Sequence, residues 1–80
     1  MMLEALELIA AERQRQVEVE GWDMEHDDKT GGSLAWAASC YANGSDANWP
    51  WHFKWWKPTP KDRIRELVKA GALIVAEIER

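Results

Sequence analysis

Hydrophobic residues recur at helical spacing in three segments of the chain, residues 3–20, 34–42 and 59–79. The third segment has the fullest apolar face, formed by Ile64, Leu67, Val68, Gly71, Ile74, Val75 and Ile78. The middle segment is apolar on nearly every side, which is typical of a central helix buried by its neighbours. We therefore predict an all-α fold, with three helices in one compact domain that spans residues 1–80.

Capping residues give the expected helix ends. Ser33 and Thr59 have the side chains that N-caps prefer, and Pro60 fits the first helical position after Thr59. Gly44 follows the second helical segment and is expected to end it. Gly71 lies inside the third helix, where glycine costs about 1 kcal/mol relative to alanine. Such a glycine commonly marks a close helix contact, so we expect Gly71 to pack against the alanine-rich second helix.

The segment between the second and third helices is rich in tryptophan. Pro50 and Pro58 exclude a regular helix there, so we predict a long ordered loop. The chain is short and has six tryptophans, which are expected to form most of its core. Of the three tryptophans that we assign a structural role, two lie in this loop. The structural tryptophans are expected to be Trp36, Trp49 and Trp51, and at least three of Trp49, Trp51, Trp55 and Trp56 are expected to be largely buried.

Composition narrows the class of protein. Eighty residues are near the lower limit for a self-sufficient core. The single cysteine, Cys40, excludes an intramolecular disulfide and fits a reducing cytoplasm. No stretch reaches the ~18 apolar residues of a membrane span, and no signal peptide is recognisable, so we expect a cytoplasmic protein without a membrane partner. Charge is uneven, with a net of −7 over residues 1–28 and +3 over residues 29–80.

The acidic loop after the first helix holds the candidate ionic sites. Arg13 interrupts the apolar stripe of the first helix, so we expect it to pair with at least one of Glu25, Asp27 and Asp28. A divalent cation is the alternative use of this loop, through Glu25, His26, Asp27 or Asp28. Because no EF-hand spacing is present, the structural use of these side chains is favoured, and no metal or cofactor is expected.

Motifs for catalysis are absent from the sequence. It contains no glycine-rich phosphate loop, no zinc signature and no nucleophile elbow. The basic aromatic run Trp51–Arg65 has the composition of a surface that stacks unpaired bases. The overall acidity argues against nucleic acid as the main partner. We therefore expect a binding module rather than an enzyme.

Several stretches resemble a family of small phage and prophage proteins. They are AAERQRQVEVEGWDMEHDD, LAWAASCYA, WPWHFKWWKP and LVKAGALIVAEIER, within residues 10–41 and 49–80. The family pattern includes a second histidine and a glutamate just before the second helix, where this chain has Thr30 and Ser33. The resemblance implies a phage-type accessory protein and does not itself imply an activity.

The order of helix, acidic loop and helix is also distantly similar to the all-α nucleotide pyrophosphohydrolases of the MazG type. An ExxE pair followed by an ExxD pair holds magnesium in those enzymes. The second helix here carries no carboxylate from Ser33 to Ala42, and Glu77 with Arg80 does not restore the second pair. The resemblance therefore implies a fold relationship with the metal site lost.

These observations favour stoichiometric binding to a host protein complex, most concretely an anti-CRISPR-like inhibition of host defence. The residues expected to bind the partner are acidic or aromatic: Glu18, Glu20, Trp22, Asp23, Glu25, Asp27, Asp28, Trp55 and Trp56. One alternative is metal-dependent nucleotide handling, and another is binding of single-stranded nucleic acid by the tryptophan-rich loop. A homodimer is also expected, because Ala70, Leu73 and Ala76 extend the apolar surface of the third helix beyond one stripe.

Overall fold

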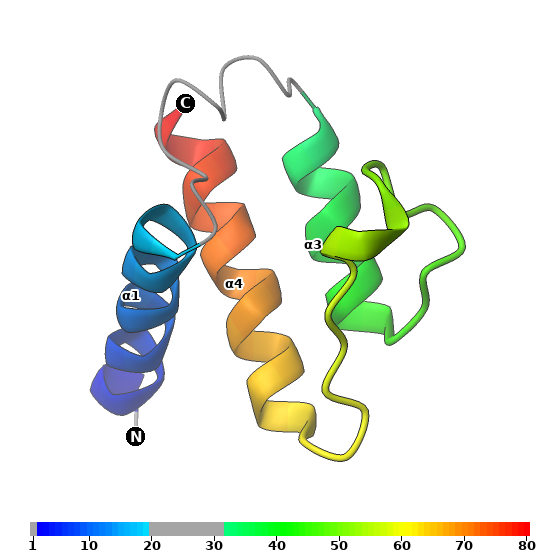
Figure 1. Ribbon diagram of the computed structural model, residues 1–80. Coiled ribbons are helices and arrows are strands. Elements are labelled where there is room, and N and C mark those ends of the chain that lie inside the picture. Colours follow the sequence, from blue (N-terminus) through cyan, green and yellow to red (C-terminus); the bar gives the residue numbers. More distant parts are fainter. Residues whose placement is uncertain (1, 20–31) are drawn as a thin grey trace.

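The computed structural model of the chain describes residues 2–19 and 32–80. Three α-helices make up most of it: α1 (Met2–Glu18), α3 (Ser33–Asn43) and α4 (Arg63–Glu79). A short 3-10 helix, η1 (Phe53–Trp55), lies in the connection between α3 and α4 (Figure 1). The described residues contain no strand, so the predicted all-α fold with three helices is confirmed. None of the described helices is long and apolar enough to cross a membrane.

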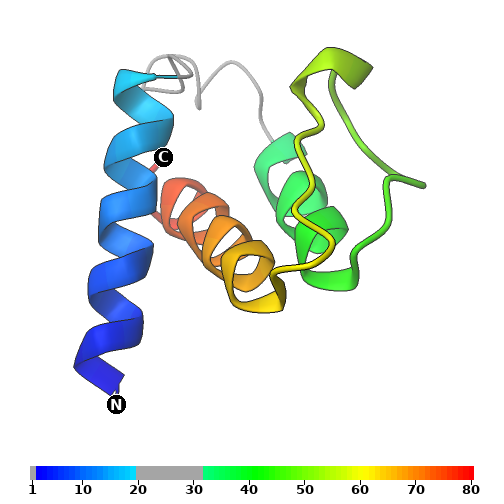
Figure 2. The same ribbon diagram turned by 60° about the horizontal axis from the view of Figure 1, so that its bottom comes forward.

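The three helices lie side by side with α4 in the middle. Helix α4 packs against α3 on one side, where the two run antiparallel, and against α1 on the other (Figures 1 and 2). The prediction that the middle segment of the sequence forms the central helix is therefore wrong. Helix α3 is an outer helix, and its Trp36 is 57% exposed, so the structural role expected of this tryptophan is wrong too.

Small residues form much of the core between α3 and α4. The buried side chains that pack together there are Leu34, Ala37, Ala38, Tyr41, Ala70, Leu73 and Ala76. Alanines on both facing surfaces let the two helices approach closely. The loop of residues 44–62 then covers this core from one side, and its tryptophans supply the bulk that the alanines lack.

The tryptophans of the loop lie against the core, as a structural role requires. Trp49, Trp51, Trp55 and Trp56 are all partly buried there. The ring centroid of Tyr41 is 5.6 Å from that of Trp49 and 4.8 Å from that of Trp56. Trp49 in turn contacts Trp51 edge to face at 5.3 Å. Such aromatic pairs add about 0.5–1.5 kcal/mol each to the burial of their surface.

Two predicted N-caps differ from the structure. Ser33 is the first residue of α3, and Gly32 precedes it without a side-chain cap. Helix α4 is capped by Asp62, whose Oδ1 accepts a hydrogen bond from the Arg65 amide at 3.0 Å, so Thr59 lies outside the helix. The C-terminal prediction for α3 is confirmed, because Gly44 adopts a φ of 70° there.

Gly71 marks a close helix contact, but with a different helix from the one predicted. A Cβ at this position would lie 2.8 Å from Cδ1 of Ile9, so Gly71 packs against α1 and not against α3. Arg13, on the same helix as Ile9, has its Nε 3.8 Å from Oε1 of Glu79. The predicted partners of Arg13 in the acidic loop lie outside the described residues.

The apolar face predicted for α4 is mostly not its buried face. Ile64, Leu67, Ile74 and Ile78 are exposed. The residues of α4 that are buried instead are Glu66, Val68, Lys69, Ala70, Ala72, Leu73 and Ala76. Two charged residues of the central helix are therefore buried against the core, while four of its large apolar side chains are exposed to solvent.

Candidate functional site: a polar cleft over α4

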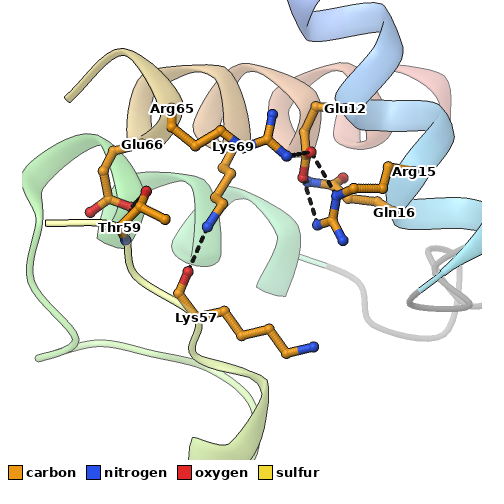
Figure 3. A network of polar contacts seen from close by, with 8 residues as sticks. All are labelled: Glu12, Arg15, Gln16, Lys57, Thr59, Arg65, Glu66 and Lys69. Atoms are coloured by element: carbon orange, nitrogen blue, oxygen red, sulfur yellow. Dashed lines mark hydrogen bonds and ion pairs between the residues drawn. The ribbon is translucent and has the colours of Figure 1, made fainter. Parts of the chain in front are cut away.

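A cleft of about 230 Å³ opens where α1, α3, α4 and the loop meet. Polar and aromatic side chains from all four elements line it: Glu12, Arg15, Gln16, Tyr41, Trp55, Lys57, Arg65 and Lys69. Figure 3 shows most of these residues beside α4, with the backbone oxygen of Lys57 turned toward Lys69 and the Lys57 side chain pointing away from it. Binding clefts commonly form in this way, between elements that each contribute a few polar groups.

Glu12 lies at the inner end of the cleft with its side chain fully buried. Arg15, one turn further along α1, holds both carboxylate oxygens, with Nε and Nη2 each donating a hydrogen bond at 2.8 Å. Nη2 of Arg65, on α4, donates a further hydrogen bond to Oε1 of Glu12. Burial alone would raise the pKa of Glu12, but the hydrogen bonds and charges of the two arginines outweigh it and hold that pKa below its usual value. The ionised carboxylate thus joins α1 to α4.

Lys69 is the second buried ion of the cleft. Its Nζ donates a hydrogen bond to the backbone oxygen of Lys57 at 2.6 Å and lies 5.4 Å from the ring centroid of Tyr41. Burial and the positive charge of Arg65 lower the pKa of Lys69. Among the described residues, no carboxylate lies within salt-bridge distance of its ammonium group. Lys69 is therefore a cation in partly desolvated surroundings, and within the described residues its ammonium group donates a hydrogen bond only to a neutral acceptor.

Buried polar side chains also fix the loop that forms one wall of the cleft. The backbone nitrogen of Lys57 donates to the Tyr41 hydroxyl at 3.2 Å, so this residue is held at both its amide and its carbonyl. Glu66, buried on α4, accepts hydrogen bonds from the amide and hydroxyl of Thr59 at 3.0 and 3.2 Å. These contacts explain why Glu66 and Lys69 replace apolar residues on the inner side of α4.

Gln16 leaves one polar atom of the cleft unsatisfied. Its side chain is buried, and its Nε2 donates a hydrogen bond to Glu12 at 3.2 Å. Its Oε1 has no donor within reach in the part of the chain that the structure describes. A buried acceptor without a donor costs about 1–3 kcal/mol, so such groups are normally satisfied by water or by a ligand.

The aromatic wall of the cleft is formed by Trp55. Two lysines lie over its ring, with Nζ of Lys54 at 5.2 Å and Nζ of Lys57 at 5.8 Å from the centroid. The predicted partner-binding tryptophans thus have different positions. Trp55 lines the cleft, whereas Trp56 packs on Tyr41 in the aromatic cluster. Neither belongs to an exposed platform of the kind that the nucleic-acid alternative requires.

Most of the residues expected to bind a partner lie outside the described residues. They are Glu20, Trp22, Asp23, Glu25, Asp27 and Asp28, together with His26 of the candidate metal site. Glu18 is described, and it lies exposed on α1, where its Oε1 accepts a hydrogen bond from Gln14 at 3.0 Å. No group of three or more metal-ligating side chains occurs within residues 2–19 and 32–80.

Apart from Trp55, the residues that line the cleft were not among the binding residues predicted from the sequence. Glu12 and Arg65 are far apart along the chain, and no spacing motif connects them. The available signal is that Glu12, Arg15 and Gln16 share one face of a helix at i, i+3 and i+4. Comparison with protein-family models, with curated proteins and with solved structures finds no match. The resemblances to phage proteins and to MazG-type enzymes therefore stay expectations.

Proposed function

We propose that this protein binds a small anionic molecule in the cleft over α4 without turning it over. The observation that carries the proposal is the charge of the cleft, because four of its lining side chains are cationic, Arg15, Lys57, Arg65 and Lys69, and one, Glu12, is anionic. The excess of cations in a partly desolvated cleft is unfavourable, and an anion bound there reduces the repulsion between them.

Gln16 indicates a second chemical group that the ligand should carry. The unsatisfied Oε1 of Gln16 calls for a donor, which a bare anion such as fully ionised phosphate lacks. The ligand we propose therefore has an anionic group for Arg65 and Lys69, and a hydroxyl or amino group for Gln16. Phosphate or carboxylate groups fit the anionic part, because guanidinium and ammonium ions are their usual partners.

The size of the cleft limits how much of the ligand it encloses. Clefts that bury a whole drug-sized molecule have volumes of about 300–1,000 Å³. At about 230 Å³, this cleft has room for the anionic group and a few further atoms, with the remainder of a larger ligand outside. A ring in that position would lie beside Trp55. A phosphorylated sugar or a nucleotide has this combination of groups, and the nucleotide alternative from the sequence is compatible with it.

Isothermal titration calorimetry with three probes tests this proposal. Inorganic phosphate supplies the anion alone, adenosine monophosphate supplies the anion with hydroxyl and amino donors, and adenosine lacks the anion. We expect the monophosphate to bind most tightly and adenosine not to bind. Arg65→Gln should weaken binding of the monophosphate by about tenfold or more, since it removes one charge-assisted contact. No binding of either anion at millimolar concentration would contradict the proposal.

Two controls make the experiment specific. Lys61→Gln removes an exposed cation just before α4 that does not line the cleft, and it should leave the affinity unchanged. An equal loss in both variants would show a general charge effect and not a site. Incubation with adenosine triphosphate and Mg²⁺ then separates binding from nucleotide hydrolysis, because released phosphate or pyrophosphate would replace the binding proposal by the enzymatic alternative.

A protein partner is the second candidate function. Trp36 and Phe53 are 57% and 70% exposed, and exposed aromatic residues are the usual centres of protein interfaces. We propose on this ground that a phage-type role, including an anti-CRISPR-like one, would use the outer surface of α3 and η1. Capture of one host protein in a stoichiometric complex, lost with Trp36→Ala and Phe53→Ala, is the expected result. Equal capture by the wild type and both variants would contradict it.

A further inference from the structure

A second pocket lies at the end of α3, apart from the cleft over α4. It has a volume of about 470 Å³ and is formed where the residues that follow α3, the loop and the beginning of α4 meet. None of the residues that line this pocket lines the cleft. A ligand of the pocket is therefore independent of the anion proposed for the cleft.

Glu66, at the inner end of the pocket, gives the strongest indication of a ligand. The residue is only 3% exposed, and both hydrogen bonds from Thr59, which lies beside it in Figure 3, reach the same carboxylate oxygen, Oε2. Among the described residues, no donor binds Oε1, and no cation lies within salt-bridge distance of the carboxylate. An ionised carboxylate accepts about four hydrogen bonds, and its burial is costly unless donors or a cation compensate it. Glu66 thus leaves an acceptor open to the pocket.

The backbone of the pocket supplies few free hydrogen-bond donors. The amides of Gly44 and Ser45 both donate to the carbonyl oxygen of Cys40. Pro58 and Pro60 also line the pocket, and a proline has no amide hydrogen. A ligand that satisfies Glu66 therefore has to bring the donors itself.

The charge of the pocket favours a cation as that ligand. Asp46 adds a second carboxylate to the lining. Arg63 adds a positive charge, but its Nη2 donates to the carbonyl oxygen of Ala42 at 2.5 Å, so it compensates the negative end of the α3 dipole. Two carboxylates and one guanidinium leave the lining with a net charge of −1.

Trp56 and the two prolines give the pocket apolar walls. The ring centroid of Trp56 is 4.8 Å from that of Tyr41 and 5.0 Å from that of Trp49, so packing fixes this wall. A bare metal ion gains nothing from such walls, whereas a carbon chain is removed from water against them. The volume is within the range of about 300–1,000 Å³ that is typical of small-molecule sites.

We propose that this pocket binds a small alkylamine in its ammonium form. The ammonium group donates to Oε1 of Glu66 and is attracted by Asp46 at the rim. The carbon chain lies against Trp56, Pro58 and Pro60.

NMR titrations of the isotope-labelled intact chain with four probes test the proposal. Butylamine carries the ammonium group and a carbon chain, butanol lacks the charge, tetramethylammonium lacks the N–H donors, and Ca²⁺ lacks the chain. The amide signal of Thr59 is the reporter, because this amide is hydrogen-bonded to Glu66. We expect a saturable shift of that signal with millimolar butylamine and none with the other three probes. No saturable shift with butylamine, or an equal response to any other probe, would overturn the proposal.

Three variants make the test specific to the pocket. Glu66→Gln keeps an oxygen for Thr59 and places an NH₂ donor where the ammonium group would bind, so the affinity for butylamine should fall by about tenfold or more. Asp46 is exposed, so Asp46→Asn should keep its helical circular dichroism and weaken binding by about two- to fivefold, which decides the matter if Glu66→Gln does not fold. Glu4→Gln removes an exposed carboxylate of α1 outside the pocket and should bind like the wild type. Unchanged affinity in Glu66→Gln and Asp46→Asn, or an equal loss in Glu4→Gln, would overturn the assignment.

Discussion

Replacing Glu12 by glutamine tests whether the buried carboxylate holds α1 against α4. The substitution keeps the shape of the side chain and removes its charge. In the native protein that carboxylate receives two hydrogen bonds from Arg15, one from Arg65 and one from Gln16. In the variant, two guanidinium groups remain beside a neutral amide, which can accept from only one of its two terminal atoms.

The size of the effect follows from burial. Breaking a fully buried ion pair by removal of one partner costs about 3–5 kcal/mol. Here the side chains of Arg15 and Arg65 are 36% and 35% exposed, so water regains part of their solvation. We therefore expect Glu12→Gln to lower the free energy of unfolding by about 2–3 kcal/mol. For a domain of this size, that corresponds to a fall in Tm of about 10–20 °C.

The same contacts give the variant a characteristic pH dependence. The arginines hold the pKa of Glu12 below its usual value in the folded protein, so the ionised carboxylate stabilises the fold. This contribution is complete above the unfolded pKa of about 4.3 and is lost as the pH falls through the lower folded pKa. The difference in stability between wild type and Glu12→Gln should therefore be largest near pH 7 and should shrink below about pH 4.

Urea unfolding followed by circular dichroism measures both effects. Glu7→Gln is the matched control, since Glu7 is exposed on the same helix, and it should change stability by less than about 0.5 kcal/mol. The reasoning is refuted if Glu12→Gln unfolds at the same urea concentration as the wild type at pH 7.

Three further substitutions test particular contacts. Gly71→Ala gains about 1 kcal/mol of helix propensity but crowds Cδ1 of Ile9. The substitution should therefore be more favourable by about 0.5–1 kcal/mol in an Ile9→Val background, which lacks that atom. Additive changes in the free energy of unfolding, measured with urea for both single variants and the double variant, would rule out the contact. Gly44→Ala forces a residue with a Cβ to a φ of 70° and should cost about 1–2 kcal/mol in a thermal melt, whereas Gly32→Ala, with open space around it, should cost less than about 0.5 kcal/mol. Lys69→Met removes the donor to a loop carbonyl and should make tryptophan fluorescence more sensitive to acrylamide; unchanged quenching would show that this bond does not hold the loop.

Helix positions were predictable from the sequence because their signals are local. The 3.6-residue period marks all three helices, and Gly44 marks the end of α3 at the residue where the structure ends it. The beginning of α4 was misjudged because two residues fit the N-cap preference. Asp62 caps the helix, while Thr59 is held by Glu66. Only the tertiary contact distinguishes the two, and it is not a local signal.

The buried side of α4 was not predictable from hydrophobicity alone. Isoleucine ranks above alanine on any hydrophobicity scale, so the stripe containing Ile74 and Ile78 looked like the core face. The alanines are buried instead, because α4 packs closely against α3. Glu66 and Lys69 are buried because they form hydrogen bonds with the backbone of the loop. Polar residues buried to bind a loop backbone have no periodicity of their own. The cleft shares this origin, because its ions come from elements far apart in the sequence.

The central claim is that the cleft over α4 binds an anion through Arg65 and Lys69. Calorimetric titration of adenosine monophosphate into the wild type, Arg65→Gln and Glu12→Gln tests it most directly, because the two substitutions change the charge of the cleft in opposite directions. At a temperature where all three proteins are folded, the account predicts binding by the wild type, weaker binding by Arg65→Gln and tighter binding by Glu12→Gln. Absence of binding by the wild type, or a loss of affinity in both variants, would contradict it.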